Sequence, residues 1–365
     1  MMYNKIVFLV SSLSQPRAIR RVESIAALGI EVVVYGYDRG QYNCNTFSPN
    51  INVNVLGEMS KGGGYLGKVK QIKNDITHIV DAHKTENCLY YSFGFIETFF
   101  LKKVGVPYAY EISDIAYSTG SLGKLRPFLK PVDNGLVKHS VFTLMTSEGF
   151  KKYLNVKNAK VIIQPNKVNR KLLGCERKVL NKKENKYIFS FVGSIRYEPV
   201  LMFARVIGER FPQHEFHFYG VANVEATKQA LDEMTNKYPN VKMFGAFKNP
   251  DDFERIYNSV DIVVTTYGLT FNERILDPNK LYEGILFCRP LIATKGTFLA
   301  EQVERYNCGW NIDSSTENSV AEFISMLTPE MVNKVSAAEK EIADDFAFDN
   351  MDKLSALLSD LVVKE

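Results

Sequence analysis

Short apolar runs alternate with segments of helical periodicity along most of the chain. In the first half the apolar runs predict strands at 5–10, 31–37, 51–55, 77–80, 107–111, 141–145 and 161–163. The segments between them predict helices at 18–28, 65–73, 86–103, 131–139 and 147–154. Because alternating strands and helices are typical of βαβ units, we expect a parallel sheet in this half.

The second half repeats the pattern. Its apolar runs predict strands at 187–192, 215–219, 241–244, 261–265 and 290–293. Helices are predicted at 198–210, 224–236, 250–258, 279–287, 298–305 and near 350–362. We therefore expect an α/β chain with domains at 1–168 and 187–345, joined by a polar, lysine-rich linker at 169–186 with no binding role.

Composition places the chain among ordinary globular proteins, with 45% hydrophobic and 24% charged residues. No apolar run approaches the roughly 18 residues that span a bilayer. The run at 5–10 is too short for a signal peptide. The five cysteines are scattered without a CxxC pair, which argues against a disulfide framework or a zinc site and favours a reducing, cytoplasmic compartment.

Charge is divided unevenly between the halves. Residues 1–172 hold 23 Lys and Arg against 12 Asp and Glu, a net of +11, and the remainder holds 22 against 29, a net of −7. A basic half suggests contact with an anionic surface. Nucleic acid is not favoured because no recognised binding motif is present. An anionic membrane leaflet fits better.

Two segments of the basic half combine apolar and cationic residues. In 117–139 three leucines at helical spacing lie among cations, although Pro127 limits a continuous helix. The stretch 61–73 is a second such patch, with Tyr65 and Leu66 among four lysines. Both are interpreted as surfaces for peripheral membrane association, the alternative being solvated basic faces.

The segment 277–292 carries the strongest chemical signal. Pro278 suits the first turn of a helix, and Lys280 and Glu283 are three residues apart, so both project from one side of that turn. A helix start with a lysine favours phosphate, and a carboxylate one turn later can accept hydrogen bonds from a ribose. The segment could hold a nucleotide, unless the pair is an incidental surface ion pair.

This segment resembles the P-x-K-x-x-E…G-x-P-x-I signature of GT-B glycosyltransferases of the family 4 type, which build bacterial surface polysaccharides. Cys288 and Arg289 stand where that family usually carries small residues, before Pro290. The resemblance implies two Rossmann-like domains facing each other across a cleft, with a C-terminal helix at about 346–365 packing on the first domain. It extends over nearly the whole chain.

The resemblance also implies a set of donor-binding residues. Gly193 follows the predicted strand 187–192, and the V-G-x-x turn at this position resembles the family's diphosphate-binding turn. The loop 268–278 is a candidate selector of the donor sugar. The full implied set is Gly193, Ser194, Arg196, Tyr219, Gly220, Phe247, Lys248, Tyr267, Arg274, Asn279, Lys280, Leu281 and Glu283.

One position departs from the family. Family 4 enzymes often carry a second glutamate eight positions before the one matched by Glu283, and here that position is Ile275. Glu273 and Asp277 are the candidate replacements. A retaining reaction is expected, and an inverting reaction with Asp114 as the general base is the alternative. No DxD pair flanked by apolar residues is present, which favours a donor diphosphate neutralised without a metal or other cofactor.

The first domain is expected to bind the acceptor. Asp114, after the strand at 107–111, is a candidate general base if the enzyme inverts, with a helix N-cap as the alternative. Glu111 and His83 are further catalytic candidates, His83 because the predicted strand 77–80 leads into it. Ser12, Ser14 and Arg17 are candidate acceptor contacts, although Arg17 could instead pair with Glu23 or a neighbouring helix.

The resulting hypothesis is a transferase that moves a sugar from a UDP- or GDP-linked donor to a lipid-linked saccharide at the inner face of the membrane. The products would be capsule, lipopolysaccharide O-antigen or exopolysaccharide. A UDP-sugar 2-epimerase of GT-B shape and a non-catalytic nucleotide-sugar binder are the alternatives from other classes.

Overall fold

The chain folds into two compact units in a computed structural model that describes residues 2–39, 46–58, 64–118, 120–157 and 159–363. The first unit comprises Met1–Pro165 together with Asn350–Glu365, and the second comprises Asn166–Asp349. Each unit has its own buried apolar core. No described helix is both long enough and apolar enough to cross a membrane.

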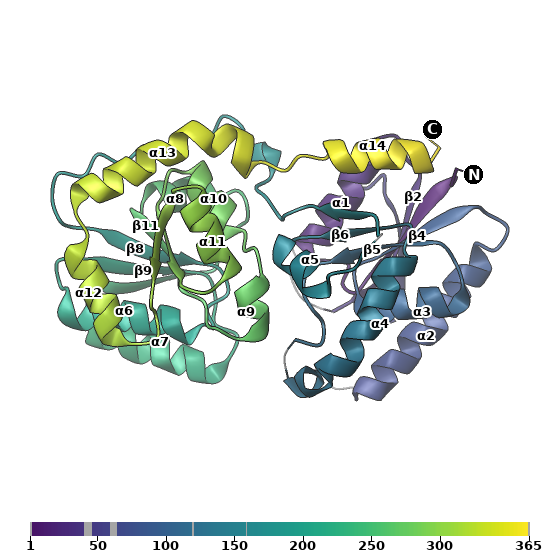
Figure 1. The fold of residues 1–365 in the computed structure, drawn as a ribbon, viewed down its shortest axis with the longest axis horizontal. Coiled ribbons are helices and arrows are strands. Elements are labelled where there is room, and N and C mark those ends of the chain that lie inside the picture. The colour runs from purple at the N-terminus through teal and green to yellow at the C-terminus, as the bar shows by residue number, and fades with distance from the viewer. Residues whose placement is uncertain (1, 40–45, 59–63, 119, 158, 364–365) are drawn as a thin grey trace. The chain divides into compact units, whose positions relative to one another are not determined.

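The first unit is built on a parallel sheet that has seven strands in the described residues (Figure 1). The strands lie in the order β3-β2-β1-β4-β5-β6-β7. Their bounds are Lys5–Val10 (β1), Val32–Asp38 (β2), Asn52–Glu58 (β3), Cys88–Ser92 (β4), Tyr108–Ile112 (β5), Phe142–Met145 (β6) and Val161–Ile163 (β7). The chain reverses its direction of travel across the sheet between β3 and β4, and this reversal places β1 beside β4.

Helices cover both faces of this sheet (Figure 1). They are Pro16–Ala26 (α1), Tyr65–Ala82 (α2), Phe95–Val104 (α3), Arg126–His139 (α4), Glu148–Leu154 (α5) and Asp352–Leu361 (α14), with a 3₁₀ helix at Gly120–Leu125 (η1). Leu354 and Leu358 of α14 are fully buried in the core that α1 shares with the sheet. The Tyr3 amide donates to the Leu361 carbonyl at 2.7 Å, which fixes the C-terminal segment to the start of the unit.

The predictions for 65–103 were wrong in part. A single helix, α2, fills the region predicted as a helix, a loop and the strand 77–80, and β4 lies inside the predicted helix 86–103. The sequence Cys-Leu-Tyr-Tyr-Ser is buried on both faces, and such a continuous apolar run does not show whether it belongs to a strand or to a helix. The neighbouring strands β1 and β5 decide the matter by pairing with it on both sides.

The second unit repeats the architecture around a parallel sheet ordered β10-β9-β8-β11-β12-β13 in the described residues. Its strands are Ile188–Val192 (β8), Glu215–Tyr219 (β9), Val241–Gly245 (β10), Ile262–Thr265 (β11), Leu291–Thr294 (β12) and Gly309–Ile312 (β13). Its helices are Glu198–Arg210 (α6), Glu225–Lys237 (α7), Phe253–Asn258 (α8), Phe271–Ile275 (α9), Lys280–Leu286 (α10), Phe298–Arg305 (α11), Glu317–Met326 (α12) and Pro329–Ala347 (α13). In Figure 1, α6 and α7 cover one face and α10, α11 and α13 the other.

The segment that we expected to be a solvated linker packs on the second unit. The Leu180 amide donates to Ser336 Oγ of α13 at 2.9 Å, and Lys182 Nζ lies 2.9 Å from Asp261 Oδ2. Phe348 is also buried in the second core and not in the first, as the expected 346–365 helix required. The chain therefore passes into the first unit only from residue 350.

Candidate functional site

Three strands of the second sheet end in glycines that lie against one another. Gly193, Gly220 and Gly245 follow β8 and β9 or end β10, and all three have positive φ angles. The Gly193 amide donates to the Tyr219 carbonyl at 2.8 Å, and the Gly220 amide donates to the Gly245 carbonyl at 2.7 Å. A Cβ on Gly220 would lie 1.8 Å from the Gly193 carbonyl oxygen, so the close approach of these backbones requires glycine.

We refer to Gly193, Gly220 and Gly245, at the carboxyl ends of β8, β9 and β10, as the glycine edge. Lys280, the first residue of α10, lies beside it. Its Cε would lie 3.4 Å from a Cβ built on Gly193, and its Nζ lies 5.9 Å from the centre of the Phe253 ring. The amides of Gly193 and Ile195 already donate to backbone carbonyls, whereas Ser194 between them is exposed. The turn after β8 and the first turn of α10 are thus brought together, as the nucleotide hypothesis requires.

Glu283 lies beneath Lys280 and is almost completely buried, at 2% exposure. Its Oε2 atom lies 2.5 Å from Lys280 Nζ and accepts a hydrogen bond from the Tyr257 hydroxyl of α8. Burial and the neighbouring Glu283 charge hold the pKa of Tyr257 well above its ordinary value, so the phenol keeps its proton and donates it. The pair is therefore a buried, hydrogen-bonded ion pair and not an incidental surface contact.

An aromatic and cationic cluster adjoins the same turn. Tyr267 is buried, with its ring centre 4.6 Å from that of Tyr197. The Arg196 guanidinium lies 5.0 Å from the centre of the Tyr197 ring and donates to its hydroxyl at 2.9 Å. Arg196 is exposed, so its charge faces solvent beside the turn at Gly193.

The residue that precedes α10, Asn279, is bonded to the start of the second unit. Asn166 Nδ2 donates to Asn279 Oδ1 at 2.9 Å. The neighbouring Lys167 places its Nζ 5.5 Å from the centre of the Tyr282 ring, and burial lowers the pKa of this lysine. Asn279 is half-buried in this arrangement, and its amide group serves first to anchor the helix start.

The other predicted donor residues differ in their exposure to solvent. Tyr219 is buried, with its ring stacked on Phe244 at 4.7 Å and its hydroxyl 3.2 Å from Ser259 Oγ. The Phe247 ring packs 5.8 Å from that of Phe253, and Lys248 is exposed. Leu281 is fully buried, so its side chain belongs to the core and offers no surface to a ligand.

The predicted loop 268–278 contains the short helix α9. Glu273 forms a capping box there, because its carboxylate accepts from the amide and the hydroxyl of Thr270 at 3.0 and 2.6 Å. Asp277 accepts from the Tyr282 hydroxyl at 2.8 Å, and Arg274 is exposed, with its Nε donating to the Leu269 carbonyl at 2.9 Å. Both stand-ins for the missing glutamate thus have local structural partners.

In the first unit, Glu111 is the centre of a buried charge cluster. Its Oε2 accepts from Arg21 Nε at 3.0 Å and from the Tyr91 hydroxyl, and its Oε1 lies 3.6 Å from Arg17 Nε. Burial alone would raise the pKa of Glu111, but the two arginines and the phenol hold it below its ordinary value. Arg17 therefore pairs with a strand residue, and not with Glu23 or with a neighbouring helix.

Three of the remaining candidates in the first unit lie where strands of the sheet end. Ser12 and Ser14 follow β1 with their hydroxyl oxygens 3.3 Å apart, and Asp114 is exposed just beyond β5. Both positions lie at the carboxyl ends of strands, where ligands of open α/β sheets bind. Asp114 is not a helix N-cap, because the next described helix begins at Gly120.

The prediction that His83 follows a strand was wrong. It follows helix α2 and not a strand, and it lies near Lys5 and Cys88 at the amino ends of β1 and β4. Its Nε2 lies 3.0 Å from the Tyr35 hydroxyl and its Nδ1 lies 3.1 Å from Glu86 Oε2. Since the expected acceptor residues lie at the opposite edge, His83 is not placed to act with them.

The two predicted membrane segments expose some of their apolar residues. Leu125 and Phe128 are 47% and 75% exposed, and Leu66 is 82% exposed. The three leucines of 117–139 do not share one helix, because η1 ends at Leu125 and α4 begins at Arg126, with Pro127 in its first turn. Residues 61–63 of the second patch, including Lys61, lie outside the described residues.

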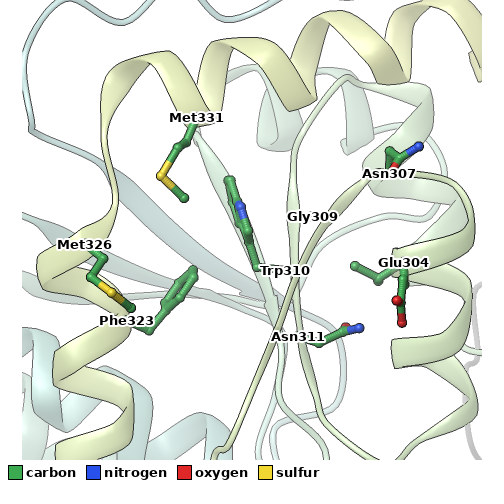
Figure 2. A pocket seen from close by; sticks show the side chains of 9 residues that line it. Glu304, Asn307, Gly309, Trp310, Asn311, Phe323, Met326 and Met331 are labelled. Carbon is green, nitrogen blue, oxygen red and sulfur yellow. The ribbon is translucent and has the colours of Figure 1, made fainter.

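A separate cavity of about 560 Å³ lies beside β13, the last strand of the second sheet (Figure 2). Trp310, Phe323, Met326 and Met331 form its apolar wall, and Glu304 and Asn307 lie on the other side of β13. The cavity includes the connection from α11 into β13, at the amino end of that strand. It is therefore distinct from the glycine edge, where β8, β9 and β10 end.

The residues that complete both charged clusters were not predicted from the sequence. Tyr257 and Tyr197 join the Lys280 region, and Arg21 and Tyr91 join Glu111. The spacing of Arg17 and Arg21, one helical turn apart, is a signal that could have paired them. Nothing in the local sequence could have identified Tyr91 and Tyr257, the buried tyrosines that donate to the two glutamates.

Solved structures that resemble this one share a single fold. The structure matches Anabaena Alr3699/HepE in complex with UDP and glucose at 16% identity, with a TM-score of 0.70, over 99% of this chain and all of that chain. The fold is that of the GT-B glycosyltransferases. WaaG, a glycosyltransferase involved in lipopolysaccharide biosynthesis, matches over 97% of this chain and 99% of its own at 13% identity, with a TM-score of 0.66.

Two further findings bear on the alternatives. A putative UDP-N-acetylglucosamine 2-epimerase from Listeria monocytogenes matches over 94% of both chains at 13% identity, with a TM-score of 0.60. The succinoglycan biosynthesis protein ExoL of Rhizobium meliloti (strain 1021) is 32% identical over 104 residues. That match spans 27% of this chain and only a quarter of the length of ExoL. No protein-family model matches the chain.

Proposed function

We propose that this protein transfers a sugar from a UDP- or GDP-linked donor to a lipid-linked saccharide during synthesis of a surface polysaccharide. The observation that carries the proposal is the placement of Lys280 against Gly193 within the second unit. An ammonium group, an exposed turn and the start of a helix converge there, and together they suit a diphosphate. Arg196 adds a second, exposed cation at the same edge.

Glu283 has a different first role from the one its position suggested. A ribose would need an accessible carboxylate oxygen, but Glu283 is 2% exposed and its Oε2 is taken by Lys280 and Tyr257. We assign to Glu283 the orientation of Lys280, with any sugar contact limited to its small exposed edge. In this proposal the leaving diphosphate is neutralised by Lys280, Arg196 and backbone dipoles, without a metal.

The proposed acceptor contacts lie in the first unit. Ser12, Ser14 and Asp114 lie at the carboxyl edge of the first sheet, so they are the proposed acceptor contacts. Asp114 is exposed and is the candidate base for an inverting reaction, whereas Glu111, held ionised by two arginines, is a positioning residue. A retaining reaction is proposed first, on the resemblance to family 4 enzymes.

Surface polysaccharide is favoured by the names of two similar proteins, ExoL and WaaG. We propose that Leu125 and Phe128, with Lys124 of η1, contact an anionic leaflet on the cytoplasmic face. Substituting Leu125 and Phe128 by serine should reduce binding to vesicles that contain phosphatidylglycerol and leave nucleotide affinity unchanged. Equal vesicle binding by the variant and the parent protein would remove this part of the proposal.

A nucleotide screen tests the central claim. UDP, GDP, ADP and CMP are added separately, and the melting temperature is followed, because a ligand that binds the native state raises it. One nucleoside diphosphate should stabilise the protein well above the others. If none does so at millimolar concentration, the nucleotide-sugar proposal fails.

An epimerase is the second candidate, on the fold shared with the Listeria protein. Incubation with the matching nucleotide sugar alone separates the two functions. A transferase should release nucleoside diphosphate only when a lipid-linked acceptor is added, whereas an epimerase converts the donor sugar and keeps it attached to the nucleotide. Conversion of the intact donor without acceptor would decide for the epimerase.

A further inference from the structure

A group of potential metal ligands lies at the turn from α2 into β4, at the end of the first sheet where its parallel strands begin. His83 follows the last residue of α2, Glu86 lies in the turn, and Cys88 begins β4. One ligand atom from each of them lies within 4.8 Å of the others, and no other set of three such residues in the described parts of the chain does so. We infer that these three side chains bind a divalent zinc-like metal ion.

The distances between the ligand atoms fit a tetrahedral centre. With bonds of roughly 2.0–2.1 Å to nitrogen and oxygen and about 2.3 Å to sulfur, tetrahedral edges are about 3.3 Å for N–O and about 3.5 Å for S–O. Here His83 Nδ1 lies 3.1 Å from Glu86 Oε2, and Cys88 Sγ lies 3.6 Å from the same oxygen. Two edges of a tetrahedral face, both meeting at Glu86 Oε2, are thus close to the required length before any metal is added, and the ligand atoms of His83 and Cys88 lie within 4.8 Å of each other.

The surrounding groups suit the orientation that a metal requires. With the metal on Nδ1, the Nε2–H of His83 donates to the Tyr35 hydroxyl, 3.0 Å away. Metal-binding histidines almost always donate a hydrogen bond from the ring nitrogen that does not bind the metal. Lys5 Nζ lies 2.8 Å from both Glu86 Oε2 and Glu31 Oε1, so Glu31 can retain the lysine when the metal takes the Glu86 oxygen.

The three candidate ligands differ in exposure, and solvent can supply a fourth ligand beside the exposed one. Cys88 and His83 are buried, whereas 36% of the Glu86 side chain is exposed. A thiolate, an imidazole and a carboxylate, with water entering beside Glu86, form the donor set of a zinc site that is open at one position. A ligand set that includes a thiolate favours zinc over magnesium or calcium, which take oxygen ligands.

The role of such a site would be structural. The proposed donor and acceptor residues lie at the carboxyl ends of the strands, and this turn lies at the opposite edge. A metal here would cross-link the end of α2 to the start of β4 and would stabilise the native state by mass action. It is therefore independent of the proposed sugar transfer, and each can fail without the other.

Cobalt(II) is the spectroscopic probe. The full-length chain, reduced and freed of metal by a chelator, is titrated with Co²⁺. We expect one equivalent to produce ligand-field bands and a thiolate-to-cobalt charge-transfer band, both removed by one equivalent of Zn²⁺. Zinc should also raise the melting temperature of the reduced protein.

Matched variants test the assignment of the ligands. Cys88→Ser should abolish the charge-transfer band, and Glu86→Gln, at an exposed position, should weaken cobalt binding at least tenfold. Cys175→Ser, at a half-buried cysteine elsewhere, should leave both unchanged. Far-ultraviolet circular dichroism confirms folding, and Glu86→Gln carries the test if Cys88→Ser does not fold. Absence of stoichiometric cobalt binding, or equal binding by the folded Glu86→Gln protein, would overturn the inference.

Discussion

Each unit of the protein contains a buried glutamate that accepts a hydrogen bond from a buried tyrosine, but the two glutamates have different cationic partners. Glu111 in the first unit faces Arg21 and Arg17, both largely shielded from solvent. Glu283 in the second unit faces one lysine, whose side chain also lies against the Gly193 turn. A carboxylate enclosed by two guanidinium groups holds the fold together, whereas one that orients a lysine at a strand end can serve a ligand.

The partners also differ in what they could release. Arg21 donates to Glu111 and also to the Met351 sulfur at 3.2 Å, so it links α1, β5 and the returning C-terminal segment. Lys280 is held by Glu283 through a flexible side chain, and lysine acts as a mobile point charge. Similar buried ion pairs therefore have a stabilising role in one unit and, in our proposal, a binding role in the other.

The largest effect is expected from Glu111→Ala. Removing this carboxylate leaves Arg21 buried without its anion, and breaking a buried pair in this way costs about 3–5 kcal/mol. Urea unfolding should show this loss in the free energy of unfolding of the first unit. Glu111→Gln, which keeps the volume, should lose less, and a loss below about 1 kcal/mol for the alanine variant would contradict the structural role.

The two tyrosines give a matched comparison. Tyr91→Phe and Tyr257→Phe each delete one hydroxyl donated to a buried carboxylate, at a cost of about 1.5–3 kcal/mol in the free energy of unfolding. Only Tyr257→Phe should also change nucleotide affinity, because Glu283 orients Lys280. Isothermal titration of both variants checks this difference, and an equal change in affinity for both would remove the distinction between the units.

Lys280→Ala should weaken nucleoside diphosphate binding by about 1–3 kcal/mol, the scale of a lost hydrogen bond to a charged group. Lys228→Ala, on the exposed face of α7, is the control and should bind as the parent does. Calorimetric affinities for the nucleotide identified in the screen provide the measurement. Unchanged affinity in the Lys280 variant would mean that the buried pair of the second unit is as structural as that of the first.

The smallest effect is on pH dependence. The pKa of Glu111 is lowered in the native state, so its contribution to stability is complete above the unfolded-state pKa of about 4.3 and is lost as the pH falls through the lower native value. Acid unfolding of the parent should therefore show a steeper loss of stability below about pH 4 than that of Glu111→Gln. Parallel curves would show that the native-state pKa of Glu111 is not lowered.

Much of the fold could be predicted because helical and strand periodicity are local properties. The strand at 161–163 and the helices at 198–210 and 298–305 were placed at the bounds that the structure shows. The strand β13 and the helices α12 and α13 were not predicted. The strand has only four residues, and the buried positions of α13 include the polar Ser336 and Glu339, whose burial follows from packing on the second unit and not from local periodicity.

The sequence by itself determined the α/β character, the glycines at the strand ends and the spacing of Lys280 and Glu283. These depend on backbone freedom and on the geometry of one helical turn, which act between near neighbours. Tertiary structure decided that β4 is a central strand and that residues 350–365 join the first unit. It also placed Tyr257 and Arg21 beside the two buried carboxylates, because such contacts between distant segments are set by the packing of the whole core and leave no local signal in the sequence.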